Sequence, residues 1–88
     1  MARFEITCIH TTPRFDPHGR IHSVGGIGFK YTQEKAIRYI EAGVASFFVH
    51  AGGHTVEVIV SMHNGYKYLK ARSDGLQPDH LLSLPECP

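Results

Sequence analysis

The chain has 88 residues, of which 42% are hydrophobic and 19% charged, and its formal net charge is +1. This length allows one domain with a modest core, and the composition excludes a disordered chain. Nine basic against eight acidic side chains argue against a dedicated nucleic-acid binder, which usually carries a clear basic excess. We therefore expect a single globular domain over residues 1–88.

The two ends of the chain suggest a cytoplasmic protein that contacts no membrane. No window approaches the roughly 18 apolar residues of a membrane-spanning helix, and the first residues enter a strand-like pattern without a signal-peptide core. Cys8 and Cys87 lie at opposite ends, and two cysteines are too few for a disulfide scaffold. We expect reduced thiols; the alternative is a single Cys8–Cys87 bridge if the ends meet.

Two strands are predicted before a glycine-rich segment. Residues 3–11 alternate loosely between apolar and polar side chains, as a half-buried strand does. Two prolines and a glycine predict a loop over residues 12–19, and residues 20–24 form a second strand. Residues 25–28, Gly-Gly-Ile-Gly, lack the spacing of a phosphate-binding loop. They also lie too far before the next helix for its N-terminus to bind a phosphate held by these glycines. We interpret these glycines as backbone relief or a β-bulge.

The clearest helix signal covers about residues 33–42. Thr32 is a good N-cap, Glu34 puts a negative charge in the first turn, and Gly43 suits the left-handed position that ends a helix. An apolar stripe makes this helix amphipathic, and it consists of Ala36, Ile37 and Ile40.

A meander of three strands is predicted after the helix, over residues 45–50, 54–62 and 66–72, with turns at Gly52-Gly53 and Asn64-Gly65. If both are two-residue turns, residue 49 faces 56, 47 faces 58, 60 faces 69, 58 faces 71, and Glu57 lies across from Arg72. The apolar face then carries Phe47, Val49, Val56, Val58, Val60, Leu69 and Ala71, and the helix is its natural cover. The second face carries Phe48, His50, Glu57, Ile59, His63, Tyr66, Tyr68, Lys70 and Arg72.

Residues 73–88 are predicted to be a packed and ordered tail. The chain breaks at residues 73–75, Ser-Asp-Gly, and then presents four leucines, which would be a liability in a free tail: Leu76, Leu81, Leu82 and Leu84. One helix cannot cover both faces of a sheet. The second face is therefore covered by this tail or by a partner, or it binds a ligand.

Few residues suggest metal binding or catalysis. His50 and His54 bracket a glycine turn and point to opposite faces, and no cysteine or carboxylate completes a zinc set. Cys8 lies on the core side of its strand, where a thiol is usually inert, and Cys87 has no activating base near it in the sequence. We expect no metal, no cofactor and no catalytic residue, although an enzyme that uses a cysteine or histidine stays as a third hypothesis.

The candidate ligand or partner face combines aromatic and basic side chains at a spacing of two. It consists of Tyr66, Tyr68, Lys70 and Arg72, with His80 added from the tail. Such an alternation can stack bases and hold phosphates. The competing interpretation is an ordinary sheet face, on which the charged ends of Lys70 and Arg72 stay in water.

Several segments carry a family resemblance: Ile9-His10, Gly25-Gly26, residues 34–43, Phe47–Val49, Tyr68–Asp74 and Leu81–Cys87. Together they resemble the small bacterial and phage proteins called domain of unknown function 3892. The chain has His80 where the family pattern leads us to expect Asn, and Ala71 where it leads us to expect Thr. The resemblance implies a standalone domain without known activity, supplies no functional residues, and favours an accessory or regulatory protein.

We therefore predict an α+β fold: a small, mainly antiparallel sheet of about five strands, one amphipathic helix over about residues 33–42 on one face, and an ordered C-terminal tail. The predicted function is non-catalytic binding or protein interaction, with self-association favoured because a spare apolar face gains from being covered. The alternative is binding of a nucleotide or short single-stranded nucleic acid.

Overall fold

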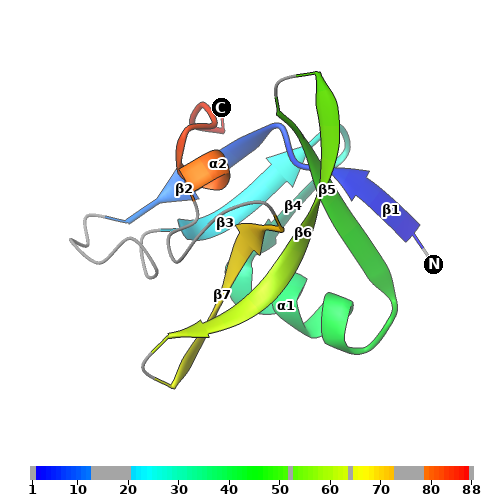
Figure 1. The fold of residues 1–88 in the computed structure, drawn as a ribbon, viewed down its shortest axis with the longest axis vertical. Helices are drawn as coiled ribbons and strands as arrows, with labels where there is room; N and C mark the ends of the chain where they lie inside the picture. Colours follow the sequence, from blue (N-terminus) through cyan, green and yellow to red (C-terminus); the bar gives the residue numbers. More distant parts are fainter. Residues whose placement is uncertain (1, 13–20, 52, 64, 73–78, 88) are drawn as a thin grey trace.

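The computed structural model describes residues 2–12, 21–51, 53–63, 65–72 and 79–87. Strands predominate in these residues, and the described part of the chain contains two helices (Figure 1). The elements follow in the order β1 (Ala2–Glu5), β2 (Cys8–Thr11), β3 (Ile21–Gly26), β4 (Phe29–Thr32), α1 (Gln33–Glu41), β5 (Ala45–Ala51), β6 (His54–His63), β7 (Tyr66–Ala71) and α2 (Asp79–Leu82).

The fold is α+β, as predicted, but its strands form two sheets and not one sheet of about five strands. The first sheet has four strands in the order β1-β5-β6-β7, and the second has three in the order β2-β3-β4. Every described strand pair is antiparallel except β1 with β5, which is parallel. Long-range pairing of this kind leaves no local trace in a sequence, which is why a single sheet was expected.

The predicted strand over residues 3–11 divides between the two sheets at Ile6. The N–H of Ile6 donates to the C=O of Phe48 at 2.9 Å, in the first sheet. The N–H of the next residue, Thr7, donates to the C=O of Gly25 at 2.9 Å, in the second sheet. Because Ile6 is only 1% exposed, the chain passes from one sheet to the other through the core.

The sequence analysis missed β4, which forms a hairpin with β3 through a turn in which Gly28 has φ of 79°. Only Phe29 and Tyr31 alternate inward before the helix begins, too short a pattern to predict a strand. The glycines of β3 do provide backbone relief: a Cβ atom on Gly26 would lie 2.3 Å from the backbone oxygen of Glu5. Gly25 and Gly26 are strand residues and Gly28 belongs to the hairpin turn, so these glycines do not form a loop that leads into the helix.

The predicted helix is confirmed as α1. Thr32 is its N-cap, and its Oγ accepts the N–H of Lys35 at 3.1 Å. Ala36 and Ile37 are buried, and Gly43 follows the helix with φ of 71°. The amphipathic pattern therefore identified both the helix and its buried side.

The predicted register of the meander is confirmed except at its start. Val49 pairs with Val56, Val60 with Leu69, and Val58 with Ala71. Pairing between β5 and β6 ends at Phe48 and Glu57, however, so residue 47 does not pair with residue 58. The two strands diverge from that point, as Figure 1 shows.

The second sheet and α1 pack on the apolar face of the first sheet. The largest fully buried side chains come from both sheets and from α2: Phe47, Ile6, Ile9, Leu69, Leu81, Val24 and Val49. Leu81 is 0% exposed, and Leu82 and Leu84 pack partly buried against the same core. The described leucines of the tail therefore pack against the core on the apolar face; Leu76 lies outside the described residues.

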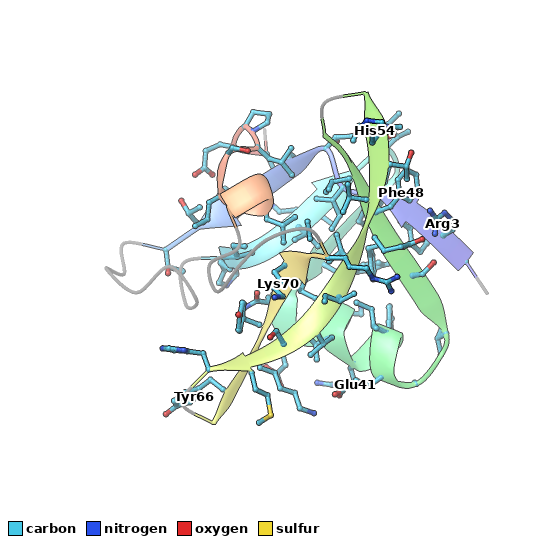
Figure 2. The ribbon with its side chains drawn as sticks, viewed as in Figure 1. Arg3, Glu41, Phe48, His54, Tyr66 and Lys70 are labelled. Carbon is cyan, nitrogen blue, oxygen red and sulfur yellow. A yellow bond between two sulfur atoms is a disulfide. The ribbon has the colours of Figure 1, made fainter. Side chains whose placement is uncertain are left out.

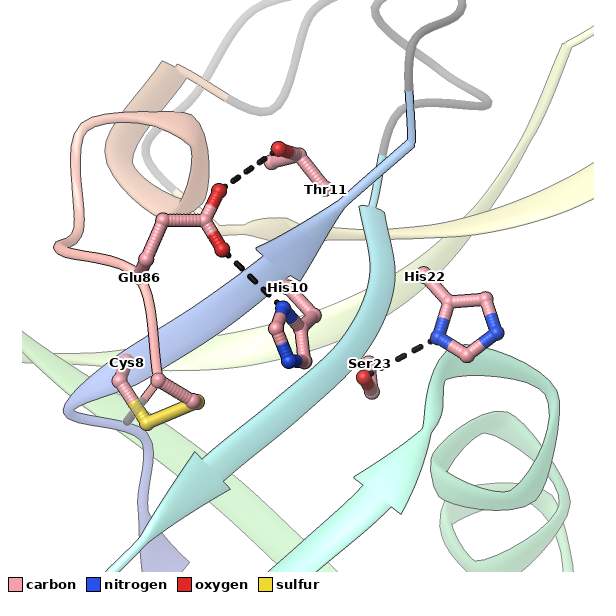
Figure 3. Close-up of polar contacts among 7 residues, drawn as sticks. Cys8, His10, Thr11, His22, Ser23 and Glu86 are labelled. Atoms are coloured by element: carbon pink, nitrogen blue, oxygen red, sulfur yellow. Dashed lines mark hydrogen bonds and ion pairs between the residues drawn. A yellow bond between two sulfur atoms is a disulfide. The ribbon is translucent and has the colours of Figure 1, made fainter.

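The end of the chain is joined to β2 by hydrogen bonds and a disulfide. The N–H of Ile9 donates to the C=O of Pro85, and the N–H of Cys87 donates to the C=O of Ile9, both at 2.9 Å. This pairing brings Cys87 beside Cys8, and their sulfur atoms are bonded (Figure 3). The expectation of reduced thiols is wrong. The two ends of the chain meet, and Cys8 and Cys87 form the single bridge that was the alternative.

Candidate functional site

The face of the first sheet that points away from the core is the candidate site, and we call it the outer face. Register places these side chains on it: Arg3, Glu5, Ser46, Phe48, His50, Thr55, Glu57, Ile59, Ser61, His63, Tyr66, Tyr68, Lys70 and Arg72. Sequence reasoning missed Arg3 and Glu5, because nothing local shows that β1 pairs with β5. Tyr68 is buried, but neither it nor the other outer-face side chains belong to the core cluster or pack against it among the described residues.

Charged and aromatic groups of β1, β5 and β6 contact one another on the outer face. The guanidinium of Arg3 forms an ion pair with the carboxylate of Glu57 and lies 4.5 Å from the centre of the Phe48 ring. The Nε2 atom of His50 lies 3.6 Å from the carboxylate of Glu5. These pairs are exposed, so each contributes little to stability, but they fix the arrangement of Arg3 and Phe48 that Figure 2 shows.

The cross-strand pair predicted between Glu57 and Arg72 is present in the backbone. The N–H of Arg72 donates to the C=O of Glu57 at 2.8 Å. The carboxylate of Glu57 instead pairs with Arg3, which reaches it from β1. The side chain of Arg72 is exposed at the end of β7.

The five residues of the predicted ligand face lie in different environments. Tyr66 is 78% exposed at the tip of the β6–β7 hairpin, whereas Tyr68 is only 2% exposed. Lys70 is half-buried and lies well away from the hairpin tip (Figure 2). His80 belongs to α2, but its side chain lies outside the described part of the structure. The two tyrosine rings therefore do not form a continuous surface on which bases could stack.

A cleft opens where β5 and β6 diverge, and we call it the β5–β6 cleft. Its volume is about 550 Å³. Apolar groups of α1, β5 and β6 line it, with three charged side chains, and the lining consists of Arg3, Ile40, Gly43, Ala45, Ser46, Glu57, Val58, Ile59, Val60 and Arg72. In Figure 1, α1 lies in the opening between the two diverging strands.

A second groove, of about 430 Å³, lies between α1 and the β6–β7 hairpin. Tyr66 borders it, and its charged groups are paired across or along it. The ammonium of Lys67 lies 2.6 Å from the carboxylate of Glu41, and the guanidinium of Arg38 lies 3.4 Å from the carboxylate of Glu34. With these pairs made, the groove offers little charge to a ligand.

Polar side chains also gather beside the disulfide, but they form no catalytic relay (Figure 3). Glu86 accepts a hydrogen bond from the hydroxyl of Thr11 at 2.8 Å and lies 3.1 Å from Nδ1 of His10. The Thr11 hydroxyl and then His10 lower the pKa of Glu86. Ser23, 3% exposed, contacts the imidazole of His22 at 3.2 Å, and not that of His10. The acid and the hydroxyl therefore have different histidine partners.

Neither metal binding nor membrane spanning has support in the described residues. No group of three or more His, Cys, Asp or Glu side chains that could hold a metal ion occurs among them. Neither described helix is long and apolar enough to cross a membrane. The predicted cytoplasmic location stays a prediction.

A family model described as a protein of unknown function, DUF3892, matches residues 5–85. The chain belongs to the DUF3892 family. No curated protein and no solved structure matches it. The matched range begins at the end of β1 and includes every later element, so DUF3892 corresponds to both sheets and both helices of this fold. The family description supplies no activity and no site residues, so a function for this DUF3892 protein must come from its surface.

Proposed function

We propose that this chain is a non-catalytic module that binds another protein through its outer face. The observation that carries the proposal is the position of the core. The second sheet, α1 and Leu81 share the core of Phe47 and Leu69, and no outer-face side chain belongs to that core. Phe48 and Ile59 are half-buried on this face, and neither belongs to the core or packs against it, whereas Tyr68 on the same face is buried.

The chemistry of the outer face fits a protein better than a nucleic acid. Aromatic and arginine side chains are enriched where proteins meet, and Arg3 over Phe48 provides that combination. Arg3 is balanced by Glu57, and Glu5 adds a further negative charge, which leaves little of the positive charge that phosphates require. The burial of Tyr68 removes half of the predicted stacking surface.

The absence of catalysis is supported by the state of the nucleophiles. Both cysteines are joined in the disulfide, so neither offers a thiolate. Among the described residues, His10 pairs with Glu86 and His50 with Glu5, and neither histidine hydrogen-bonds to a serine or a cysteine. This arrangement holds side chains in place and does not activate a nucleophile.

Site-specific photocrosslinking tests the proposal. A photoreactive amino acid replaces Ile59 on the outer face, or Lys30 on β4 as the matched control, in cells that normally make the protein. We expect protein adducts at Ile59 in clear excess over those at Lys30. Equal yields at the two positions, or none at Ile59, would contradict the proposal.

Sedimentation velocity then identifies the class of partner. If the partner is a second copy of the chain, as predicted, the purified protein should sediment as a concentration-dependent dimer or larger species. A monomer at high concentration would remove self-association and leave a different protein as the partner.

A further inference from the structure

We infer that the β5–β6 cleft holds an extended segment of the partner protein, which pairs with the backbone of Val60 and places an acidic side chain at Arg72. This inference rests on the proposed function and specifies its site. Four observations carry it: where pairing ends, which way the backbone of β6 points, what lines the cleft, and the charge at its rim.

The first observation is that β6 has a strand partner along only part of the edge that faces β5. Its pairing with β5 covers residues 54–57, whereas its pairing with β7 covers residues 58–63. Residues 58–60 of β6 and residues 45–46 of β5 line the cleft from its two sides. An unpaired stretch of strand edge is the usual template for adding an extended peptide.

The second observation is the direction of the backbone groups. In an antiparallel pair, successive residues point their N–H and C=O groups to opposite sides. The C=O of Glu57 points to β7, where it accepts the N–H of Arg72, so the N–H and C=O of Val60 point away from β7. Leu69, which lies opposite Val60 on β7, supports this direction, because its N–H donates to Gln33 Oε1 and not to β6. Val60 therefore presents a donor and an acceptor toward the cleft.

The third observation is the apolar lining, which supplies a place for a side chain of the added segment. Ile40 of α1, Ala45 of β5 and Val58 of β6 line the cleft. About 550 Å³ lies within the usual size of a ligand site. Because alternate side chains of an extended peptide point the same way, a segment on Val60 can insert an apolar side chain here.

The fourth observation is the charge at the rim. Three charged side chains line the cleft, and Arg3 is paired with Glu57. The third, Arg72, is exposed, and its position is fixed by the backbone bond to Glu57. The rim therefore has one more positive than negative charge, which selects an acidic residue in the partner because Arg binds carboxylates through two parallel hydrogen bonds.

Nuclear magnetic resonance titration with short peptides tests the inference. The probe is an acetylated and amidated Glu-Val-Glu-Val-Glu peptide; the comparisons are its Lys-Val-Lys-Val-Lys analogue and the acidic peptide with N-methylated valines, which cannot pair with a strand. We expect the acidic peptide alone to shift the amide signals of residues 58–60 and Arg72. Arg72→Gln should weaken its binding about tenfold, as the loss of a charge-assisted hydrogen bond predicts.

Lys70→Gln is the matched control, because Lys70 is on the same strand and face but does not line the cleft. It should change peptide affinity less than twofold. The inference is overturned if the lysine or N-methylated peptide binds equally well, if the signals that shift lie elsewhere on the outer face, or if no peptide binds at millimolar concentration. In each case the adducts at Ile59 still decide the proposed function separately.

Discussion

At the scale of single residues, Gly26 sets how closely the two sheets approach. Its Cβ position would fall 2.3 Å from the backbone oxygen of Glu5 and 2.6 Å from the ring of Phe29. Backbone atoms cannot rotate aside as a side chain can, so any larger residue must push β3 away from β1. The glycine is required by this contact, because its φ does not lie in the left-handed region.

We predict that Gly26→Ala lowers the free energy of unfolding by about 1–3 kcal/mol, the usual cost of overpacking. Urea unfolding followed by circular dichroism measures it. The adjacent variant Ile27→Ala is the control, since Ile27 is 97% exposed and its truncation should change stability by less than about 0.5 kcal/mol. An unchanged urea midpoint for Gly26→Ala would show that the sheets can separate without cost.

Glu86 provides a second prediction, on pH. Its pKa is lowered from 4.5 by the Thr11 hydroxyl and by His10. A carboxyl whose pKa is lower in the folded state stabilises the fold above its ordinary pKa, and that stabilisation is lost as pH falls through the folded-state pKa. The difference in stability between the wild type and Glu86→Gln should therefore shrink as pH falls from about 6 to 3. A difference that stays constant over this range, in urea unfolding at each pH, would contradict the assignment.

At the scale of elements, the sequence predicted what is local. The caps of α1, its apolar stripe and the register of β6 with β7 were all correct, because each depends on residues close together in the chain. It did not predict the division of residues 2–11 between two sheets or the strand β4, since these depend on partners far along the chain. Arg3 was missed at the candidate site for the same reason. Tyr68 was expected to be exposed but is buried, because the alternation of side chains shows which face a residue is on but not whether that face is covered there.

The joining of the tail to β2 gives a prediction at this scale. The disulfide links residues that are 79 apart in sequence. A cross-link of that span stabilises mainly by restricting the unfolded chain, so reduction should lower the free energy of unfolding by about 2–4 kcal/mol. Urea unfolding with and without a phosphine reductant measures this, and Cys8→Ser with Cys87→Ser is the control that should not respond to reductant.

Thiol titration of the unfolded, unreduced protein checks the disulfide itself. We expect no free thiol. Two free thiols per chain would mean that the cysteines meet without bonding, and the effect of reductant on stability should then vanish.

At the scale of the whole molecule, Ile6 makes the two sheets depend on each other. It bonds to the first sheet, the next residue bonds to the second, and its side chain is in their shared core. Because one continuous segment supplies a strand to each sheet, neither sheet can lose that strand without disturbing the other. We expect the two sheets to unfold together.

Ile6→Ala tests this coupling. It should cost about 2–5 kcal/mol, as truncation of a buried isoleucine does. Amide exchange at β3 and at β6 should accelerate together, since both report the same global opening. Faster exchange in one sheet alone would show that the sheets open independently.

The bond between Cys8 and Cys87 also determines how the molecule responds to mechanical force. A pull on the chain from outside the two cysteines passes through the sulfur–sulfur bond, so the strands between Cys8 and Cys87 carry none of it, whereas β1, which precedes Cys8, is loaded against β5. In a single-molecule stretching experiment the oxidised protein should therefore lengthen only by the few residues of β1, whereas the reduced protein should lengthen in one large step as both sheets yield. Oxidised, the chain from Cys8 to Cys87 would behave as an inextensible link.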